Sequence, residues 1–141
     1  MNPIILKLRT APIALVVCVL ITGCSPACHI TEFDVWSTAD HIDIRLGNQP
    51  PQRTITDPVL IAKIATFAQA HADGWGSPWY GTPVGNITLE VYSGHRFMGH
   101  LAIGPTFLES QGCDDFMSRS LSQTDRRAIL SLVGLPEDGS K

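Results

Sequence analysis

Residues 86–103, NITLEVYSGHRFMGHLAI, decide the fold because they alternate apolar and polar side chains through two successive runs. A period of two is typical of amphipathic β-strands, and the Ser93-Gly94 pair between the runs is typical of a turn. The sequence therefore predicts two consecutive antiparallel strands with one buried face. The alternating apolar or small residues are Ile87, Leu89, Val91, Phe97, Gly99, Leu101 and Ile103.

The register of this hairpin follows from the numbering of its apolar residues. All of them are odd-numbered. If they pair with one another on one face, the numbers of each pair sum to an even value, and the loop between the strands then has an odd number of residues. This pattern therefore excludes a two-residue turn. We expect a three-residue loop, Tyr92–Gly94, with its glycine in the left-handed conformation. This loop would pair Val91 with His95 and would place Glu90 opposite Arg96 in an outer-face ion pair.

Two shorter alternating runs precede this hairpin, at residues 33–36 and 41–46. The turn-forming residues 37–40 separate them, and the segment 47–52, GNQPPQ, interrupts the pattern as a loop. We expect a first hairpin with apolar side chains toward the core. Its second strand would direct three polar side chains to water: His41, Asp43 and Arg45.

Two helices are predicted from their boundary residues. Asp57 is a suitable N-cap and Pro58 fits the first helical position, where its missing N–H is not needed; Gly74 is a suitable end. The second helix begins at Ser122, three residues before an aspartate in a pattern that resembles a capping box, and ends at Gly134.

The order of elements is strand, strand, helix, strand, strand, strand, helix, with the last strand at residues 106–109 and an irregular segment at 110–120. This order predicts an α+β fold in which an antiparallel sheet of about five strands carries both helices on one face. The other face is mostly polar, so we expect it to be solvated or available to a partner.

The loop at residues 73–85 is rich in glycine, proline and aromatic residues. Trp75, Trp79 and Tyr80 carry large apolar surfaces, so this loop either packs over the sheet as a lid or forms an exposed recognition surface. These three residues are the candidate binding surface.

The N-terminal segment has the composition of a secretory signal. Residues 1–9 contain Lys7 and Arg9 and no acidic residue, and residues 11–21 are apolar apart from Pro12. Such an apolar run is shorter than the stretch needed to span a bilayer of about 30 Å as a stable helix. We therefore exclude this segment from the fold.

The apolar run leads directly into Ile21-Thr22-Gly23-Cys24, which resembles the lipobox of bacterial lipoproteins. The resemblance covers residues 1–24 only and implies cleavage before Cys24 and diacylation of its sulfur, with palmitate-type chains as the membrane anchor. Ser25 at the next position implies transfer to the outer membrane, facing the periplasm, if the organism has two membranes. The alternatives are an ordinary signal peptide and an N-terminal membrane helix.

The resemblance divides the chain into a removed signal peptide at 1–23, a lipidated cysteine and tether at 24–32, one α+β domain at 33–134 and a C-terminal tail at 135–141. Removal of Lys7 and Arg9 changes the formal charge from −3 to −5. The mature chain then lacks the basic surface that nucleic acids and anionic lipids require, so the acyl chains are the expected membrane contact.

Two other cysteines follow from the same resemblance. If Cys18 leaves with the signal peptide and Cys24 is lipidated, Cys28 and Cys113 are the remaining thiols in an oxidising compartment. We expect them to form a disulfide that closes a loop of about 85 residues and contributes on the order of 4 kcal/mol. Two free thiols, or a Cys/His metal pair that includes His29, are the alternatives.

The sequence contains no Gly-x-Ser-x-Gly motif, no phosphate-binding glycine loop and no His-Glu-x-x-His motif. A metal site or an acid–base pair would need contacts between residues that are distant in the sequence. The residues available for such contacts are His41, His95, His100, Asp43, Glu90 and Asp114.

We therefore expect a lipid-anchored envelope protein whose domain binds another protein or an envelope polymer without catalysis. An inhibitor or immunity-type role is compatible with this interpretation. A small envelope hydrolase and a metal-binding module are the alternatives, and no cofactor is expected.

Overall fold

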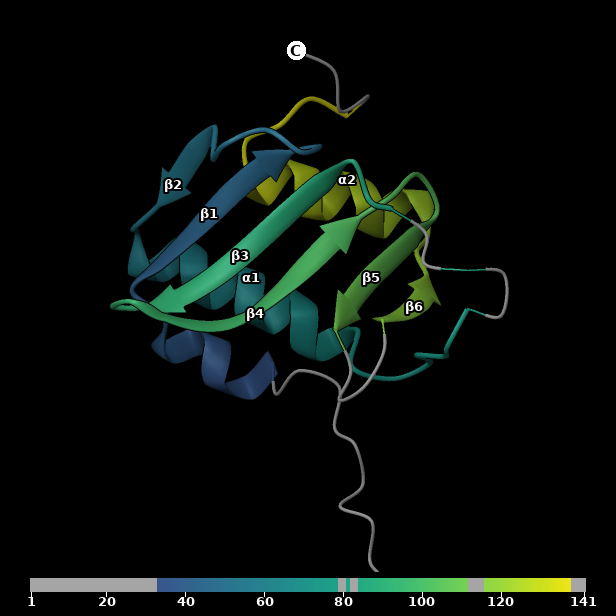
Figure 1. Cartoon of the computed structure of the whole chain (residues 1–141), viewed down its shortest axis with the longest axis horizontal. Coiled ribbons are helices and arrows are strands. Elements are labelled where there is room, and N and C mark those ends of the chain that lie inside the picture. Colours follow the sequence, from purple (N-terminus) through teal and green to yellow (C-terminus); the bar gives the residue numbers. More distant parts are fainter. Residues whose placement is uncertain (1–32, 79–80, 82–83, 112–115, 138–141) are drawn as a thin grey trace, which may run out of the picture.

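The structure is a computed structural model that describes residues 33–78, 81, 84–111 and 116–137. Six antiparallel strands form one sheet in the order β2-β1-β3-β4-β5-β6. Both helices and a short 3-10 helix, η1, lie behind this sheet as it is seen in Figure 1. The elements are η1 (Phe33–Thr38), β1 (His41–Leu46), β2 (Arg53–Ile55), α1 (Pro58–Ala70), β3 (Ile87–Ser93), β4 (Arg96–Ile103), β5 (Phe107–Gln111), β6 (Phe116–Ser120) and α2 (Gln123–Leu132).

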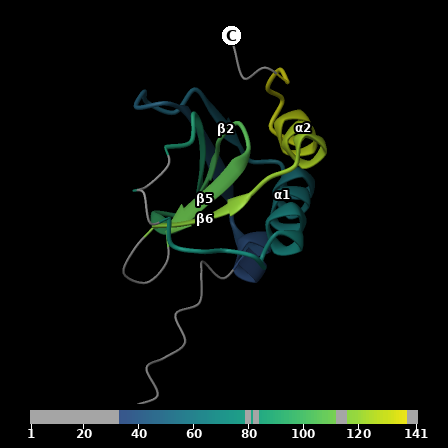
Figure 2. The same cartoon turned by 90° about the vertical axis from the view of Figure 1, so that its right-hand side faces the viewer.

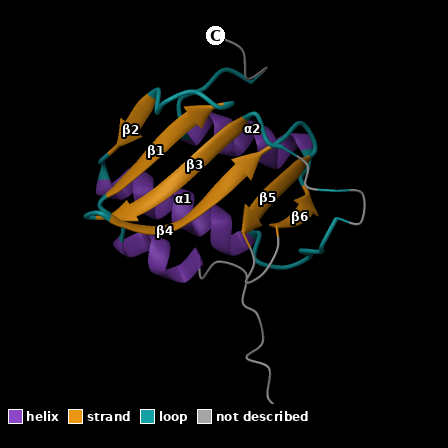
Figure 3. Ribbon diagram, in the orientation of Figure 1, coloured by secondary structure: helices purple, strands orange, loops and turns teal. Residues whose placement is uncertain are grey.

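The predicted α+β class and the antiparallel sheet are confirmed, and both helices cover the same face (Figures 2 and 3). The sheet has six strands where about five were expected. The core lies between the sheet and the helices and includes Trp36, Leu89, Leu101 and Ile129, whose side chains are fully buried. No described helix is long and apolar enough to cross a membrane.

The prediction of a strand at residues 33–36 is wrong, because Phe33–Thr38 forms η1. Phe33 and Trp36 are both buried, and a spacing of three brings their rings together on one side of a 3-10 helix at 4.9 Å. The hydroxyl groups of Ser37 and Thr38 donate to backbone carbonyls three residues earlier. These local bonds favour the helical turn over an extended strand.

Two strands were not predicted. β2 has only three residues, and β6 lies in the segment that was expected to be irregular. Neither strand has an apolar pattern, and each is held by pairing, β2 with β1 and β6 with β5. One further bridge, between Gly76 and Ser118, protects the outer edge of β6.

The hairpin of β3 and β4 has a two-residue turn, Gly94-His95, so the predicted three-residue loop is wrong. The numbers of paired residues still sum to an even value farther along, as in Val91 with Gly99. A β-bulge next to Val91 and Tyr92 explains how a two-residue turn and this register occur in the same hairpin. The bulge adds one residue to β4 and so shifts the pairing by one position.

The bulge also changes which side chains face outward. Arg96 pairs with Ser93, on the helix-covered side, while Glu90 pairs with His100. The predicted Glu90–Arg96 ion pair is therefore wrong. Phe97, which was expected in the core, pairs with Tyr92 and lies on the opposite face.

The predicted helix starts are confirmed. The Asp57 carboxylate accepts a hydrogen bond from the Val59 N–H at 2.9 Å, with Pro58 in the first turn. The Ser122 hydroxyl accepts from the Asp125 N–H at 3.0 Å. Each cap satisfies a backbone donor that the helix itself leaves unpaired.

Candidate functional site

No described helix or strand covers one face of the sheet, as the edge-on view in Figure 2 shows. Among the side chains that strand register and alternation place on this face, ten form the candidate site, and we call the surface that they form the open face. They are His41, Asp43, Arg45, Thr88, Glu90, Tyr92, Phe97, His100, Glu109 and Phe116.

Five of these rings form an aromatic band across the sheet. His41 stacks on Tyr92 with 5.1 Å between ring centroids, and Tyr92 contacts Phe97 edge-on at 5.6 Å. His100 continues the band, 6.4 Å from Phe97 and 6.3 Å from Phe116. Phe97 is 46% exposed and Phe116 is 39% exposed, so the band presents apolar surface to solvent.

A charged cluster lies beside the band. The Arg45 Nε lies 2.8 Å from the Glu90 Oε2 as a charge contact, not an aligned hydrogen bond. The Tyr92 hydroxyl donates to the same oxygen at 3.0 Å. Contact with Glu90 raises the pKa of Arg45, and burial, followed by the hydrogen bond to Glu90, raises the pKa of Tyr92. Both groups therefore keep their protons at neutral pH.

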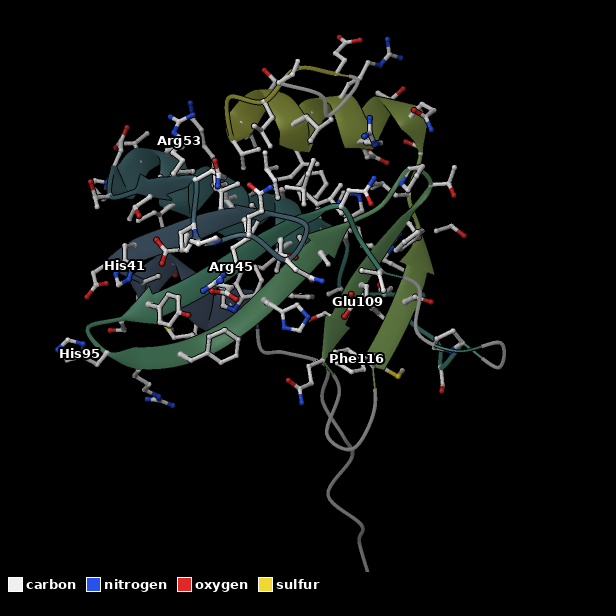
Figure 4. All side chains as sticks on the ribbon, turned by 45° about the horizontal axis from the view of Figure 1, so that its top comes forward. His41, Arg45, Arg53, His95, Glu109 and Phe116 are labelled. Carbon is white, nitrogen blue, oxygen red and sulfur yellow. The ribbon has the colours of Figure 1, made fainter. Side chains whose placement is uncertain are left out.

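A histidine–carboxylate pair lies at the other end of the band. The His100 Nε2 is 3.1 Å from the Glu109 Oε1, and Glu109 is only 6% exposed although no helix covers it. Phe116 lies on the same face of the neighbouring strand, at a position diagonal to Glu109 (Figure 4). Such a pair can orient an imidazole for proton transfer. Among the described residues, however, the structure records no hydroxyl hydrogen-bonded to the His100 ring.

The sequence did not point to Glu109. The strand expected at 106–109 contained it, but the pairing of Ala102 with Glu109 is what brings it to His100. The sequence of a strand does not show that an outward-facing carboxylate is buried, because side chains of the neighbouring strands shield it.

The candidate aromatic loop is described only in part. The Trp75 Nε1 donates to the His71 carbonyl at 2.8 Å, and its ring packs against the core 6.0 Å from Phe33. Trp75 thus fixes the loop to the helix layer. Trp79 and Tyr80 lie outside the described residues.

Of the histidines and carboxylates available for a metal site or an acid–base pair, those on β1, β3 and β4 share the open face: His41, Asp43, Glu90 and His100. His41 lies beside Asp40, and Asp43 accepts a hydrogen bond from Thr54 at 2.6 Å. His95 lies at the tip of the turn, far from Glu109 in Figure 4. Within the described ranges no group of three or more metal-binding side chains is present. Besides Trp79 and Tyr80, the candidate residues outside those ranges are Cys24, Cys28, Cys113 and Asp114.

Comparison with protein-family models, with curated proteins and with solved structures found no significant match. No relative therefore supplies an activity or a partner for this chain. The open face is the feature from which we infer function.

Proposed function

We propose that the protein is a lipid-anchored bacterial envelope lipoprotein whose domain binds a basic segment of another envelope protein through its open face, without catalysis. The observation that supports this proposal is the aromatic band on an uncovered sheet. Soluble domains seldom leave large aromatic side chains exposed side by side, and aromatic residues are enriched in the centres of protein interfaces.

The position of Phe97 strengthens this proposal. In a regular hairpin with an even register, Phe97 would share the buried face with Val91. The bulge instead places its ring between Tyr92 and His100 on the open face, where it loses core burial. Bulges that redirect a side chain are often found next to functional surfaces.

The charges on the open face indicate the chemistry of the partner. Asp43, Glu90 and Glu109 outnumber the one arginine, Arg45, so this face carries an excess of negative charge when its histidines are neutral. Complementary potentials increase association rates and select against like-charged partners. A segment with lysine or arginine beside apolar side chains fits both the aromatic band and this charge.

The proposed anchor restricts where the partner lies. Phe33 lies nine positions after Cys24, so a fully extended tether between them reaches about 30 Å. The domain would then meet its partner close to the membrane, facing the periplasm if the organism has an outer membrane. Cys28 and Cys113 would form the disulfide near the start of the domain.

The His100–Glu109 pair favours a second candidate, a small envelope hydrolase in which His100 activates water. This candidate predicts esterase or amidase activity that is lost in both His100→Asn and Glu109→Gln. Retention of partner binding by either variant, without any hydrolysis by the wild type, would favour the binding domain.

Site-specific photo-cross-linking in intact cells tests the proposal. A benzoylphenylalanine placed at position 97 or 116 of the full-length protein is expected to cross-link to one protein, and peptide mapping should locate the contact in a basic segment. Val59 is the control position, because it is 64% exposed and lies on α1 behind the sheet. Cross-links to glycan or lipid alone from positions 97 and 116 would refute the protein partner.

The charge argument has its own test. Asp43→Asn removes one negative charge from the open face and keeps an oxygen that can accept from Thr54. We expect weaker cross-linking and a smaller dependence on salt than in the wild type. Asp73→Asn is the matched control, because Asp73 is exposed outside the open face. Equal effects of the two substitutions would contradict a role of charge in binding.

A further inference from the structure

A hollow of about 400 Å³ lies between the segment at residues 74–78 and the strands β5 and β6. Its lining includes Phe107, Thr106, Ser118 and Ser120. None of the five rings of the aromatic band lines it, although Phe107, Ser118 and Ser120 lie on the same face of the sheet as Glu109. The hollow is therefore a neighbour of the open face that is built from other residues. Its volume lies within the range of small-molecule sites.

The walls of the hollow are held by backbone hydrogen bonds. Gly76 and Ser118 exchange two N–H···O bonds of 2.9 Å each, which join the loop to β6. The Leu121 N–H donates to the Thr106 carbonyl at 2.8 Å and closes the opposite side. The hollow is thus formed without a ligand, which lowers the cost of binding.

The ring of Phe107 is seated against backbone. A Cβ atom on Gly104 would lie 2.3 Å from two atoms of this ring, so the ring occupies space that only glycine leaves free. This contact fixes Phe107 as a rigid apolar surface in the lining.

The polar groups of the lining are neutral hydroxyls. Ser77, Thr106, Ser118 and Ser120 each supply one, and none of these residues has a recorded side-chain hydrogen bond to another part of the described chain. A hydroxyl both donates and accepts, so this set suits ligands that carry hydroxyls of their own.

The described lining of the hollow is nearly uncharged, which favours a neutral ligand over an ionic one. Among the described lining residues there is no carboxylate side chain that could serve as a counter-ion for a cation. Arg119 is the one charged residue of this described lining, and its guanidinium donates to the backbone carbonyls of Asp73 and Ser120. These bonds use two of the five guanidinium N–H groups and hold the side chain against the protein backbone.

We propose that this hollow is a carbohydrate subsite that holds a neutral sugar ring against Phe107, with the hydroxyls of Thr106, Ser118 and Ser120 bonded to those of the sugar. The C–H groups of a sugar ring pack on an aromatic face while its hydroxyls point sideways toward polar groups. The subsite is independent of the proposed partner of the open face, because it uses none of the same residues.

The test is an amide-shift titration of the ¹⁵N-labelled full-length protein in detergent micelles. The probes are glucose, N-acetylglucosamine and the β-1,4-linked tetrasaccharide of each. We expect saturable shifts at Gly76, Ser118 and Ser120. Equal affinity for monomer and tetramer would identify a free sugar as the ligand, and tighter binding of a tetramer would identify a polysaccharide. Absence of saturable shifts with all four probes, or shifts with sulfate alone, would overturn the proposal.

Substitutions locate the binding. Phe107→Leu is expected to weaken sugar binding about fivefold or more, since it removes the aromatic face. If circular dichroism shows that this variant is misfolded, the double variant Ser118→Ala/Ser120→Ala replaces it as the test, and it should also bind the sugar more weakly than the wild type. Ser131→Ala on α2 is the matched control and should bind as the wild type does. Unchanged affinity in the folded hollow variants would refute the subsite.

A further pair of variants separates this subsite from the open face. Phe97→Ala and Phe116→Ala should leave sugar binding unchanged and reduce cross-linking to the protein partner. Loss of sugar binding in these two variants would place the sugar on the aromatic band and overturn the subsite in the hollow. Failure of the partner experiment with intact sugar binding would refute only the proposed function.

Discussion

Glu109 is a buried carboxylate whose partner is the ring of His100, at 3.1 Å. Removing the carboxylate with Glu109→Ala would leave the imidazole without this acceptor on a shielded part of the sheet. We expect a loss of about 1–3 kcal/mol in the free energy of unfolding, measured by urea denaturation.

Glu109→Gln is the matched variant, because its amide oxygen can still accept from the His100 ring. Its loss of stability should be clearly smaller than that of Glu109→Ala. Equal losses in the two variants would show that the hydrogen bond does not stabilise the fold.

Tyr92 gives the open face a measurable response to alkaline pH. Burial and the bond to Glu90 raise the pKa of its hydroxyl above 10.0, so the folded protein keeps a proton that the unfolded chain loses. This contribution to stability is complete below the unfolded pKa and is lost as the pH rises through the folded pKa. Urea midpoints of the wild type should therefore fall more steeply between pH 9 and 11 than those of Tyr92→Phe. Parallel pH profiles would contradict the raised pKa of Tyr92.

At the scale of elements, the turn of the β3–β4 hairpin depends on one glycine. Gly94 has φ 59° at the first turn position, and its N–H donates to the Asp40 carboxylate, which lowers the pKa of Asp40. Positive φ at the first of two turn residues is the pattern of a type II′ turn. We expect Gly94→Ala to cost about 1–2 kcal/mol of unfolding free energy.

Gly76→Ala is the control for this substitution, since Gly76 has no positive φ and no atom within 4 Å of an added Cβ. Urea denaturation should show little change in Gly76→Ala. A similar loss in both variants would mean that the left-handed turn is not the cause.

The sequence predicted the elements whose cause is local. Asp57 and Ser122 begin helices because their own side chains accept from backbone N–H groups two or three residues ahead. In contrast, residues 33–36 contain two patterns: Phe33 and Val35 alternate as in a strand, whereas Phe33 and Trp36 have the spacing of a 3-10 turn, which is the conformation in the structure. β6 has no apolar pattern, and its pairing with β5 cannot be read from its own residues.

The candidate site was predictable only in part. Alternation correctly placed His41, Asp43 and Arg45 outside the core, because the period of a strand fixes its faces. The aromatic band depends on the bulge, which sends Phe97 outward after a two-residue turn. The odd numbers of the apolar residues require that the two numbers of each pair sum to an even value. Both a three-residue loop and a two-residue turn followed by a bulge meet this requirement, so the sequence could not distinguish them.

At the scale of the whole molecule, the lipid anchor is the first prediction. Cys24→Ser should abolish metabolic labelling with radioactive palmitate and release the protein from the membrane fraction. Cys18→Ser is the matched control and should keep both the label and the membrane location. Continued membrane association of Cys24→Ser would favour the N-terminal membrane helix instead.

The two proposed binding regions would bind ligands of different kinds. The open face supplies aromatic and acidic groups for a protein, while the hollow at the β6 edge supplies neutral hydroxyls for a sugar. Both lie in a domain that nine residues of chain would hold near the membrane. A protein of this design would link a partner to the envelope surface at short range.

The most direct test of the central claim is the yield of photo-cross-linking in intact cells from position 97 relative to position 59. Both positions are exposed, at 46% and 64%, but Phe97 lies on the open face and Val59 on the helix layer. We predict a single protein adduct at position 97, with a yield at least about tenfold above that at position 59. Equal yields at the two positions, or an adduct from position 59 only, would contradict the open face as the binding surface.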